Sequence, residues 1–79
     1  MQITYDARAD IVGITFREGR VFETLEIAPE INLDFGRNKV PLYMEIVGAS
    51  EKLGKSNVTE LAVKQFMARE LVSVKSRTR

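Results

Sequence analysis

The sequence contains no cysteine and no histidine, and these two absences exclude several classes of chemistry. Without cysteine there is no disulfide, no thiolate metal site and no thiol nucleophile. Without histidine the chain lacks the commonest metal ligand and the usual general base near neutral pH. The serines have no histidine partner, and no glycine-rich phosphate loop is present. We therefore predict a protein that is not an enzyme, has no catalytic residues and uses no metal or other cofactor.

Long apolar runs are also missing, since none exceeds three residues, whereas a membrane helix needs about 20. The first residues, Met1–Asp6, lack the basic start and apolar core of a signal peptide, so we expect a cytoplasmic protein with no membrane association. With 79 residues, 44% apolar and 29% charged, the chain has the composition of one small globular domain over 1–79. A chain this short buries only about 60% of its unfolded surface, so we expect it to oligomerise, most simply as a homodimer.

Residues 1–50 alternate apolar and polar side chains with the period of β-strands. Short polar segments, Glu18–Arg20 and Gly36–Lys39, separate the alternating runs. Turns of two to four residues join antiparallel strands, because a parallel crossover needs a longer connection. The pattern predicts an antiparallel β-meander of four or five strands over residues 1–50.

The period changes in the last third of the chain. From Asn57 the apolar residues follow helical spacing: Val58, Leu61, Ala62, Val63, Phe66, Met67 and Leu71. This predicts a C-terminal helix over 57–72, followed by a basic tail over 73–79. An apolar sheet face must be covered, so we expect the helix to pack on it near Ile14, Leu33 and Met44. The predicted fold class is α+β.

Three short motifs within residues 1–53 resemble the small bacterial and archaeal family known as domain of unknown function 2283. They are Ile3-x-Tyr5-Asp6-x-x-Ala9-Asp10-x-x-x-Ile14, then Ile31-x-Leu33-Asp34, and finally Val40-x-x-x-Met44-Glu45-Ile46-x-x-Ala49-Ser50. The sequence departs from the family pattern at Gly13, where an aromatic residue is usual, and at Pro41–Tyr43. The family has no established activity, so the resemblance assigns no functional residues. It implies an antitoxin-like partner of a small RNase-type toxin.

Four carboxylates form the most conspicuous polar set: Asp6, Asp10, Asp34 and Glu45. Asp6 and Asp10 flank the first turn, and Asp34 and Glu45 point to the polar side of the predicted sheet. Oxygen ligands of this kind suit Mg²⁺ or Ca²⁺. Aspartates beside a turn also bond their own backbone, however, and acids on a polar sheet face are ordinary surface residues. We favour this structural interpretation and predict no metal site.

Two apolar surfaces are candidates for binding a partner. Phe22 and Tyr43 fall on the polar side of the predicted sheet, where the two rings would form an exposed patch if they lie side by side. Val63 and Met67 extend the apolar stripe of the helix beyond what one sheet face needs, and are available to pair with a second copy. The open edges of the sheet provide a further binding surface.

Charge is unevenly divided along the chain. Residues 1–50 hold five basic and eight acidic residues, a net charge of −3, whereas residues 51–79 hold seven basic and three acidic residues, a net charge of +4. The leading hypothesis is a non-enzymatic interaction protein that covers the active surface of a small basic protein partner, with Lys75, Arg77 and Arg79 ordering on binding. The alternative is weak nucleic-acid binding through these three residues together with Lys64 and Arg69.

Overall fold

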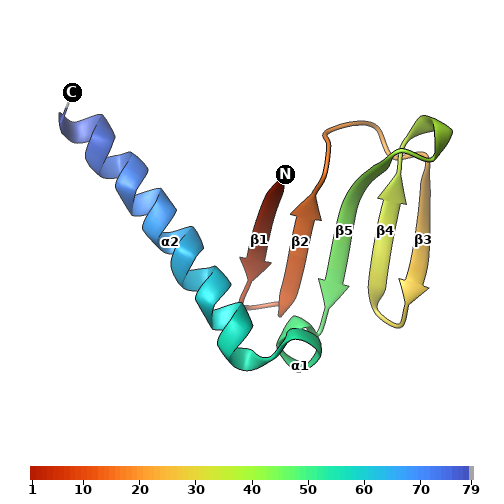
Figure 1. The fold of residues 1–79 in the computed structure, drawn as a ribbon, viewed down its shortest axis with the longest axis horizontal. Helices are drawn as coiled ribbons and strands as arrows, with labels where there is room; N and C mark the ends of the chain where they lie inside the picture. Colours follow the sequence, from red (N-terminus) through yellow and green to blue (C-terminus); the bar gives the residue numbers. More distant parts are fainter. Residues whose placement is uncertain (79) are drawn as a thin grey trace.

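A computed structural model describes the backbone of residues 1–78 and the side chains of residues 1–68. Its elements, in chain order, are β1 (Gln2–Asp6), β2 (Ile11–Thr15), β3 (Glu23–Ala28), β4 (Ile31–Phe35), a 3₁₀ turn η1 (Arg37–Lys39), β5 (Pro41–Val47), α1 (Ala49–Leu53) and α2 (Lys55–Thr78). The five strands form one antiparallel sheet and the helices follow it in sequence (Figure 1). The predicted α+β class is confirmed.

The strand order is β1-β2-β5-β4-β3, so the sheet is not the simple meander that the sequence predicted. Only β1–β2 and β3–β4–β5 are joined by short connections. The segment around Glu18–Arg20 is not a tight turn but part of a crossing from β2 to the far edge strand β3 (Figure 1). Local alternation cannot reveal this, because it identifies strands without saying which strands pair. Gly19 lets the crossing pass close to β5, where an added Cβ would lie 3.2 Å from the Leu42 side chain.

The strand register divides the sheet into two faces. One row of paired residues runs Ile3, Ile14, Met44, Leu33 and Leu25 across all five strands, and a second begins with Tyr5, Val12, Ile46 and Ile31. These rows form the apolar face. The opposite rows carry Thr4, Gly13, Glu45, Asn32 and Glu26, and then Gln2, Thr15, Tyr43, Asp34 and Thr24, and form the polar face. The alternation in the sequence identified both faces.

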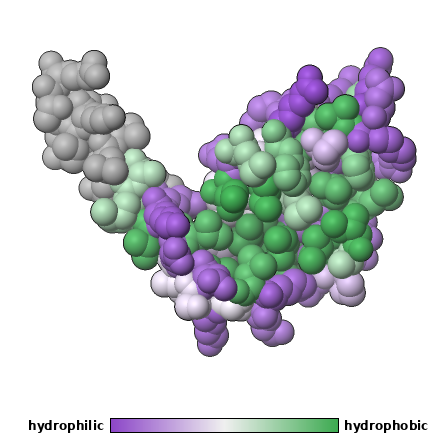
Figure 2. Space-filling view, viewed as in Figure 1, coloured by the Kyte–Doolittle hydropathy of each residue, from purple (hydrophilic) through white to green (hydrophobic). Residues whose placement is uncertain are grey.

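The buried core is small and lies at one corner of the apolar face. Val12, Ile46, Ala49 and Val58 form a cluster in which α1 and the first turn of α2 meet the sheet. Toward the β3 edge the same face is open, since Leu25 is 43% and Ile27 51% exposed. Figure 2 shows the hydrophobic surface spreading over the sheet with no element in front of it.

Helix α2 covers the apolar face only with its first two turns, through Val58 and Leu61. It then runs beside β1 and leaves the sheet (Figure 1), contrary to the expectation that it lies across the face. Two features set this direction. Gly54, with φ of +94°, turns the chain between the helices, and the Gln65 amide is hydrogen-bonded to the backbone of Tyr5 at the open edge of β1.

The helices also differ from the predicted bounds. Helix α2 begins at Lys55 rather than at 57 and its backbone continues to Thr78, through most of the segment expected to be a tail. The side chains of Lys75 and Arg77, and Arg79 as a whole, lie outside the described residues. Within the described part of the chain, neither helix is both long and apolar enough to cross a membrane.

Candidate functional site

Asp10 is the centre of a hydrogen-bond network that joins the first hairpin to α1. Its Oδ1 accepts bonds from the Tyr5 hydroxyl at 2.6 Å and from the Ser50 backbone N–H at 3.0 Å, and its Oδ2 accepts the Ser50 hydroxyl at 2.7 Å. The N-cap residue of α1 is Gly48, which has no side chain. Asp10 therefore caps this helix from 40 positions away, supplying the acceptor that a polar N-cap residue ordinarily provides.

The network shifts the pKa of both ionisable members. The hydrogen bonds from Tyr5 and Ser50 hold the pKa of the Asp10 carboxyl below its ordinary value of 3.8. The same bond to Asp10 raises the pKa of Tyr5 above 10.0, since a phenolate could not donate it. Tyr5, Asp10 and Ser50 all belong to the motifs that carry the family resemblance, and here they hold structure together.

The other three candidate carboxylates are dispersed. Asp6 accepts bonds from the backbone N–H groups of Arg8 and Ala9, which is the turn chemistry that the sequence analysis favoured. Asp34 accepts a 2.6 Å bond from the Thr24 hydroxyl, and Glu45 is exposed on the polar face. Among the residues that the structure describes, no three acidic side chains gather into a group able to hold a metal ion.

The polar face is the first surface suited to a partner. None of the five strands contains a lysine or an arginine. Four acidic residues, Asp6, Glu26, Asp34 and Glu45, alternate onto this face. The face is therefore negatively charged across its whole width.

A hollow of about 280 Å³ lies in the middle of the polar face, and the acceptor side chains of Asn32, Asp34 and Glu45 line it. Gly13 forms part of its wall, and a Cβ there would lie 3.3 Å from the Thr4 hydroxyl oxygen. An aromatic residue, which the family pattern would place at this position, would occupy this space. The departure at Gly13 thus leaves this hollow open.

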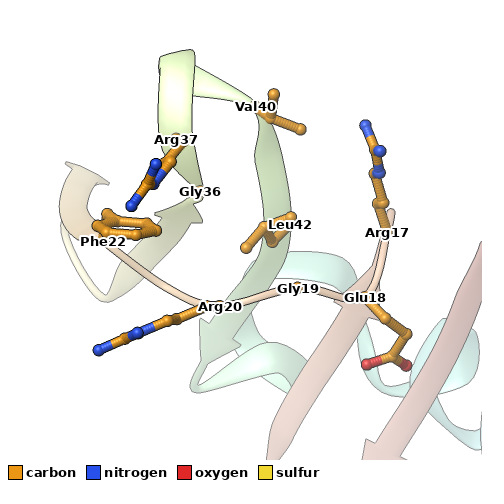
Figure 3. A pocket seen from close by; sticks show the side chains of 9 residues that line it. All are labelled: Arg17, Glu18, Gly19, Arg20, Phe22, Gly36, Arg37, Val40 and Leu42. Atoms are coloured by element: carbon orange, nitrogen blue, oxygen red, sulfur yellow. The ribbon is translucent and has the colours of Figure 1, made fainter.

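A second hollow, of about 270 Å³, lies where the β2–β3 crossing passes the turn before β5 (Figure 3). Arg37 and Arg20 place their guanidinium carbons 5.1 and 5.6 Å from the centroid of the Phe22 ring, and Arg17 lies on the other side of the hollow. These distances are those of cation–π pairs. Three arginines and one acid, Glu18, line the hollow, and two of the arginines lie beside an aromatic ring that is 52% exposed.

The predicted partner residues have separate surroundings. Phe22 lines the arginine hollow, whereas Tyr43 lines the polar-face hollow and shares hydrogen bonds with Glu18 and Gly19. The expected patch of two neighbouring rings is therefore replaced by two distinct sites. Val63 and Met67 lie on α2 and are 54% and 52% exposed, together with Phe66 at 59%.

Sequence reasoning missed the arginine hollow. Arg17 and Arg20 are close in sequence, but Arg37 joins them only because the chain crosses the sheet. The turn that carries Arg37 also depends on left-handed backbone at Asn38 and Lys39, with φ of 59° and 61°. Asparagine is common in the left-handed conformation but lysine is not, so the sequence indicates this backbone at Asn38 and not at Lys39.

Comparison with known proteins agrees with the position of the family motifs in the first two-thirds of the chain. The family model described as "Protein of unknown function (DUF2283)" matches residues 2–50, which are the whole sheet and the start of α1. Comparisons with curated proteins and with solved structures gave no match. The match covers well over half of the chain and confirms the resemblance carried by its three motifs, so the chain belongs to the DUF2283 family.

Proposed function

We propose that the protein is a non-enzymatic, antitoxin-like interaction protein of the cytoplasm, and that its acidic polar face binds a small basic protein. The observation that supports this is the single sign of charge in the sheet, whose strands carry acids, four of them on the polar face, and no basic residue. Proteins that act on RNA carry basic surfaces that attract phosphates. An acidic face complements such a surface, speeds the encounter and disfavours acidic partners.

The polar-face hollow gives the proposal a specific contact. A lysine or arginine of the partner that enters beside Gly13 meets the carboxylates of Asp34 and Glu45 and the amide oxygen of Asn32. Charge-assisted hydrogen bonds to such groups are stronger than neutral ones. A toxin whose RNA-binding side chains are held in this way is blocked by occupation of its surface, with no chemistry required of the antitoxin.

An affinity pull-down from the native host tests the proposal. We expect the wild-type protein to retain one small basic protein, with or without nuclease treatment of the lysate. Glu45→Lys should reduce its recovery at least tenfold, because it places a positive charge at the hollow. Glu51→Lys is the matched control, since it makes the same charge change at an exposed position of α1 and should retain the partner. Equal losses in the two variants, or no protein partner at all, would contradict the proposal.

The arginine hollow favours a second candidate function, weak binding of single-stranded nucleic acid. Arg20 and Arg37 beside Phe22, with Arg17 across the hollow, supply charge for phosphates, and the Phe22 ring supplies an aromatic surface for a base. Binding of a labelled RNA oligonucleotide, followed by fluorescence anisotropy, should weaken at higher salt and in an Arg20→Ala/Arg37→Ala variant. If Lys75→Ala/Arg77→Ala has the larger effect, the basic C-terminal segment is the site instead. An RNA affinity that changes neither with salt concentration nor in either double variant would exclude this function.

A further inference from the structure

The apolar face of the sheet is the largest feature that neither proposed binding site uses. A folded monomer of 8.9 kDa is expected to expose about 4,800 Å², yet this chain exposes 6158 Å². The excess is about 1,300 Å², whereas each partner in a standard protein interface buries about 800 Å². The radius of gyration, 14.9 Å, likewise exceeds the about 11.6 Å of a compact chain of this length. The chain therefore holds enough surplus surface for a stable interface.

Two separate apolar surfaces are exposed among the side chains that the structure describes. The first is the sheet face, open from Ile3 at 46% exposure to Leu25 at 43% and Ile27 at 51% (Figure 2). The second is a stripe on α2 formed by Val63, Phe66 and Met67, all more than half exposed. At 3.6 residues per turn this stripe lies on a different side of the helix from Val58, Leu61 and Gln65, which contact the helix's own sheet.

The helix cannot swing over to cover its own sheet without losing its attachment. Val58 is only 3% exposed and is packed with Val12, Ile46 and Ala49. Gln65 is tied to the β1 edge by hydrogen bonds of 3.0 and 3.5 Å to the Tyr5 backbone. These contacts direct the helix away from the open face, and its outward stripe stays available for another molecule.

We infer that the occupant of the apolar sheet face is helix α2 of a second copy of this chain. The part of α2 beyond Gln65 continues to Thr78 and is about 20 Å long, and the outer strands of a five-stranded sheet are about 19 Å apart, so this part is long enough to cross the face. Packing a helix on a sheet is the standard way to cover an apolar face.

In this dimer each copy covers the other through the same pair of surfaces, as a two-fold axis requires. The polar faces then point outward on both sides. The inference does not depend on the proposed function, because it uses the opposite face of the sheet, and either can fail alone.

Sedimentation of the full chain gives the first test. We expect a mass of twice 8.9 kDa at tens of micromolar. Leu25→Glu and Phe66→Glu should each weaken dimerisation more than tenfold, since they place a charge in the interface from the sheet side and from the helix side. Both positions are exposed in the single chain, so circular dichroism should show retained secondary structure. Glu45→Gln, on the polar face, is the control and should leave the dimer intact. The inference would be overturned if the wild-type protein were a monomer, or if neither Leu25→Glu nor Phe66→Glu weakened dimerisation.

Cross-linking distinguishes the arrangement of the copies. Because the chain has no cysteine, single cysteines introduced in separate preparations form disulfides only where they were placed. A tagged Phe66→Cys chain mixed with untagged Leu25→Cys or Leu33→Cys should give a mixed disulfide on oxidation. The same chain mixed with Glu45→Cys should give only background. Helix-on-sheet packing would be contradicted if the mixed disulfide formed no more than in the Glu45→Cys mixture. It would also be contradicted if Phe66→Cys chains cross-linked mainly to each other, and either result would indicate a different interface.

Discussion

At the scale of single residues, Asp10 illustrates how a conspicuous acid can be structural. Its backbone lies in the left-handed region, with φ of 58°, at the last position of the turn between β1 and β2. Its carboxylate bonds Tyr5 and Ser50, and its backbone oxygen accepts the Ala49 N–H at 3.0 Å. One residue thus joins the hairpin to the segment that follows β5.

The Asp10 network predicts a specific dependence of stability on pH. The pKa of Asp10 is lower in the folded than in the unfolded chain, so the folded state favours the carboxylate. The resulting stabilisation is present above about pH 3.8 and is lost as the pH falls through the lower folded value. We expect Asp10→Asn to lower Tm by several degrees at pH 6, and the difference from wild type to shrink on acidification.

Thermal unfolding followed by circular dichroism between pH 2 and pH 7 measures this effect. Glu51→Gln, an exposed acid outside the network, serves as the control and should follow the wild-type curve. A constant Tm difference between Asp10→Asn and wild type at every pH would show that ionisation of Asp10 does not contribute.

The tyrosine in the same network gives an independent prediction at alkaline pH. The hydrogen bond to Asp10 is the main reason why the pKa of Tyr5 is raised, so removing the carboxylate should return the Tyr5 titration toward 10.0. The stabilisation from Tyr5 is present below that value and is lost as the pH rises through the folded pKa. Ultraviolet absorbance titration should show an earlier tyrosine transition in Asp10→Asn than in wild type, and Tyr43→Phe variants of both would isolate Tyr5.

At the scale of elements, helix α2 is held by few contacts for its length. Val58 and Leu61 attach its first two turns to the core, and Gln65 attaches the helix to the edge of β1. The Gln65 amide is hydrogen-bonded to both the N–H and the carbonyl of Tyr5, as a neighbouring strand would be. It thereby protects an edge that would otherwise pair with another chain.

We predict that Gln65→Ala loosens α2 more than it destabilises the sheet. The substitution removes two hydrogen bonds that are each worth about 1 kcal/mol, and alanine keeps the helix propensity high. Amide hydrogen exchange should accelerate in α2 and at Tyr5, with β4 and β5 little changed. Lys64→Ala, which breaks only the exposed ion pair with Glu60, is the matched helix control and should leave the exchange at Tyr5 unaltered.

Particular elements also show how far the sequence determines the fold. The strands, their two faces and the start of a helix follow from periods of two and 3.6 residues, and all appear in the structure. The pairing of β2 with β5 does not follow, because it joins residues about thirty positions apart with no local signal. The direction of α2 depends on Gly54 and on the contact between Gln65 and Tyr5, 60 positions apart. For the candidate sites, alternation placed Asp34 and Glu45 on the polar face but did not identify that face as a binding surface, whereas the arginine hollow needed the crossing chain.

At the scale of the whole molecule, the two faces of one thin sheet divide the surface by chemistry. The molecule measures 44 × 30 × 16 Å, so its shortest dimension leaves little room for a second layer over the sheet. Val12, Leu42, Ile46, Ala49 and Val58 are the only apolar residues buried among the side chains that the structure describes. A core this small gives a single chain only a marginal free energy of unfolding. Association with another chain would bury more apolar surface and raise it.

The thermal stability of the protein should therefore depend on its concentration. If each chain supplies part of the other's core, unfolding also dissociates the dimer, and a hundredfold rise in concentration stabilises the folded dimer by about 2.7 kcal/mol. Calorimetry at a few micromolar and at a few hundred micromolar should show Tm rising with concentration. Leu25→Ala should reduce Tm and also flatten this dependence, because Leu25 belongs to the proposed interface and lies outside the single-chain core. Val12→Ala should cost about 2–3 kcal/mol, because the residue is 2% exposed within one chain. The rise of Tm with concentration in Val12→Ala should remain that of the wild type. A Tm that stays constant over this range would mean that each chain folds alone, with its apolar face in water.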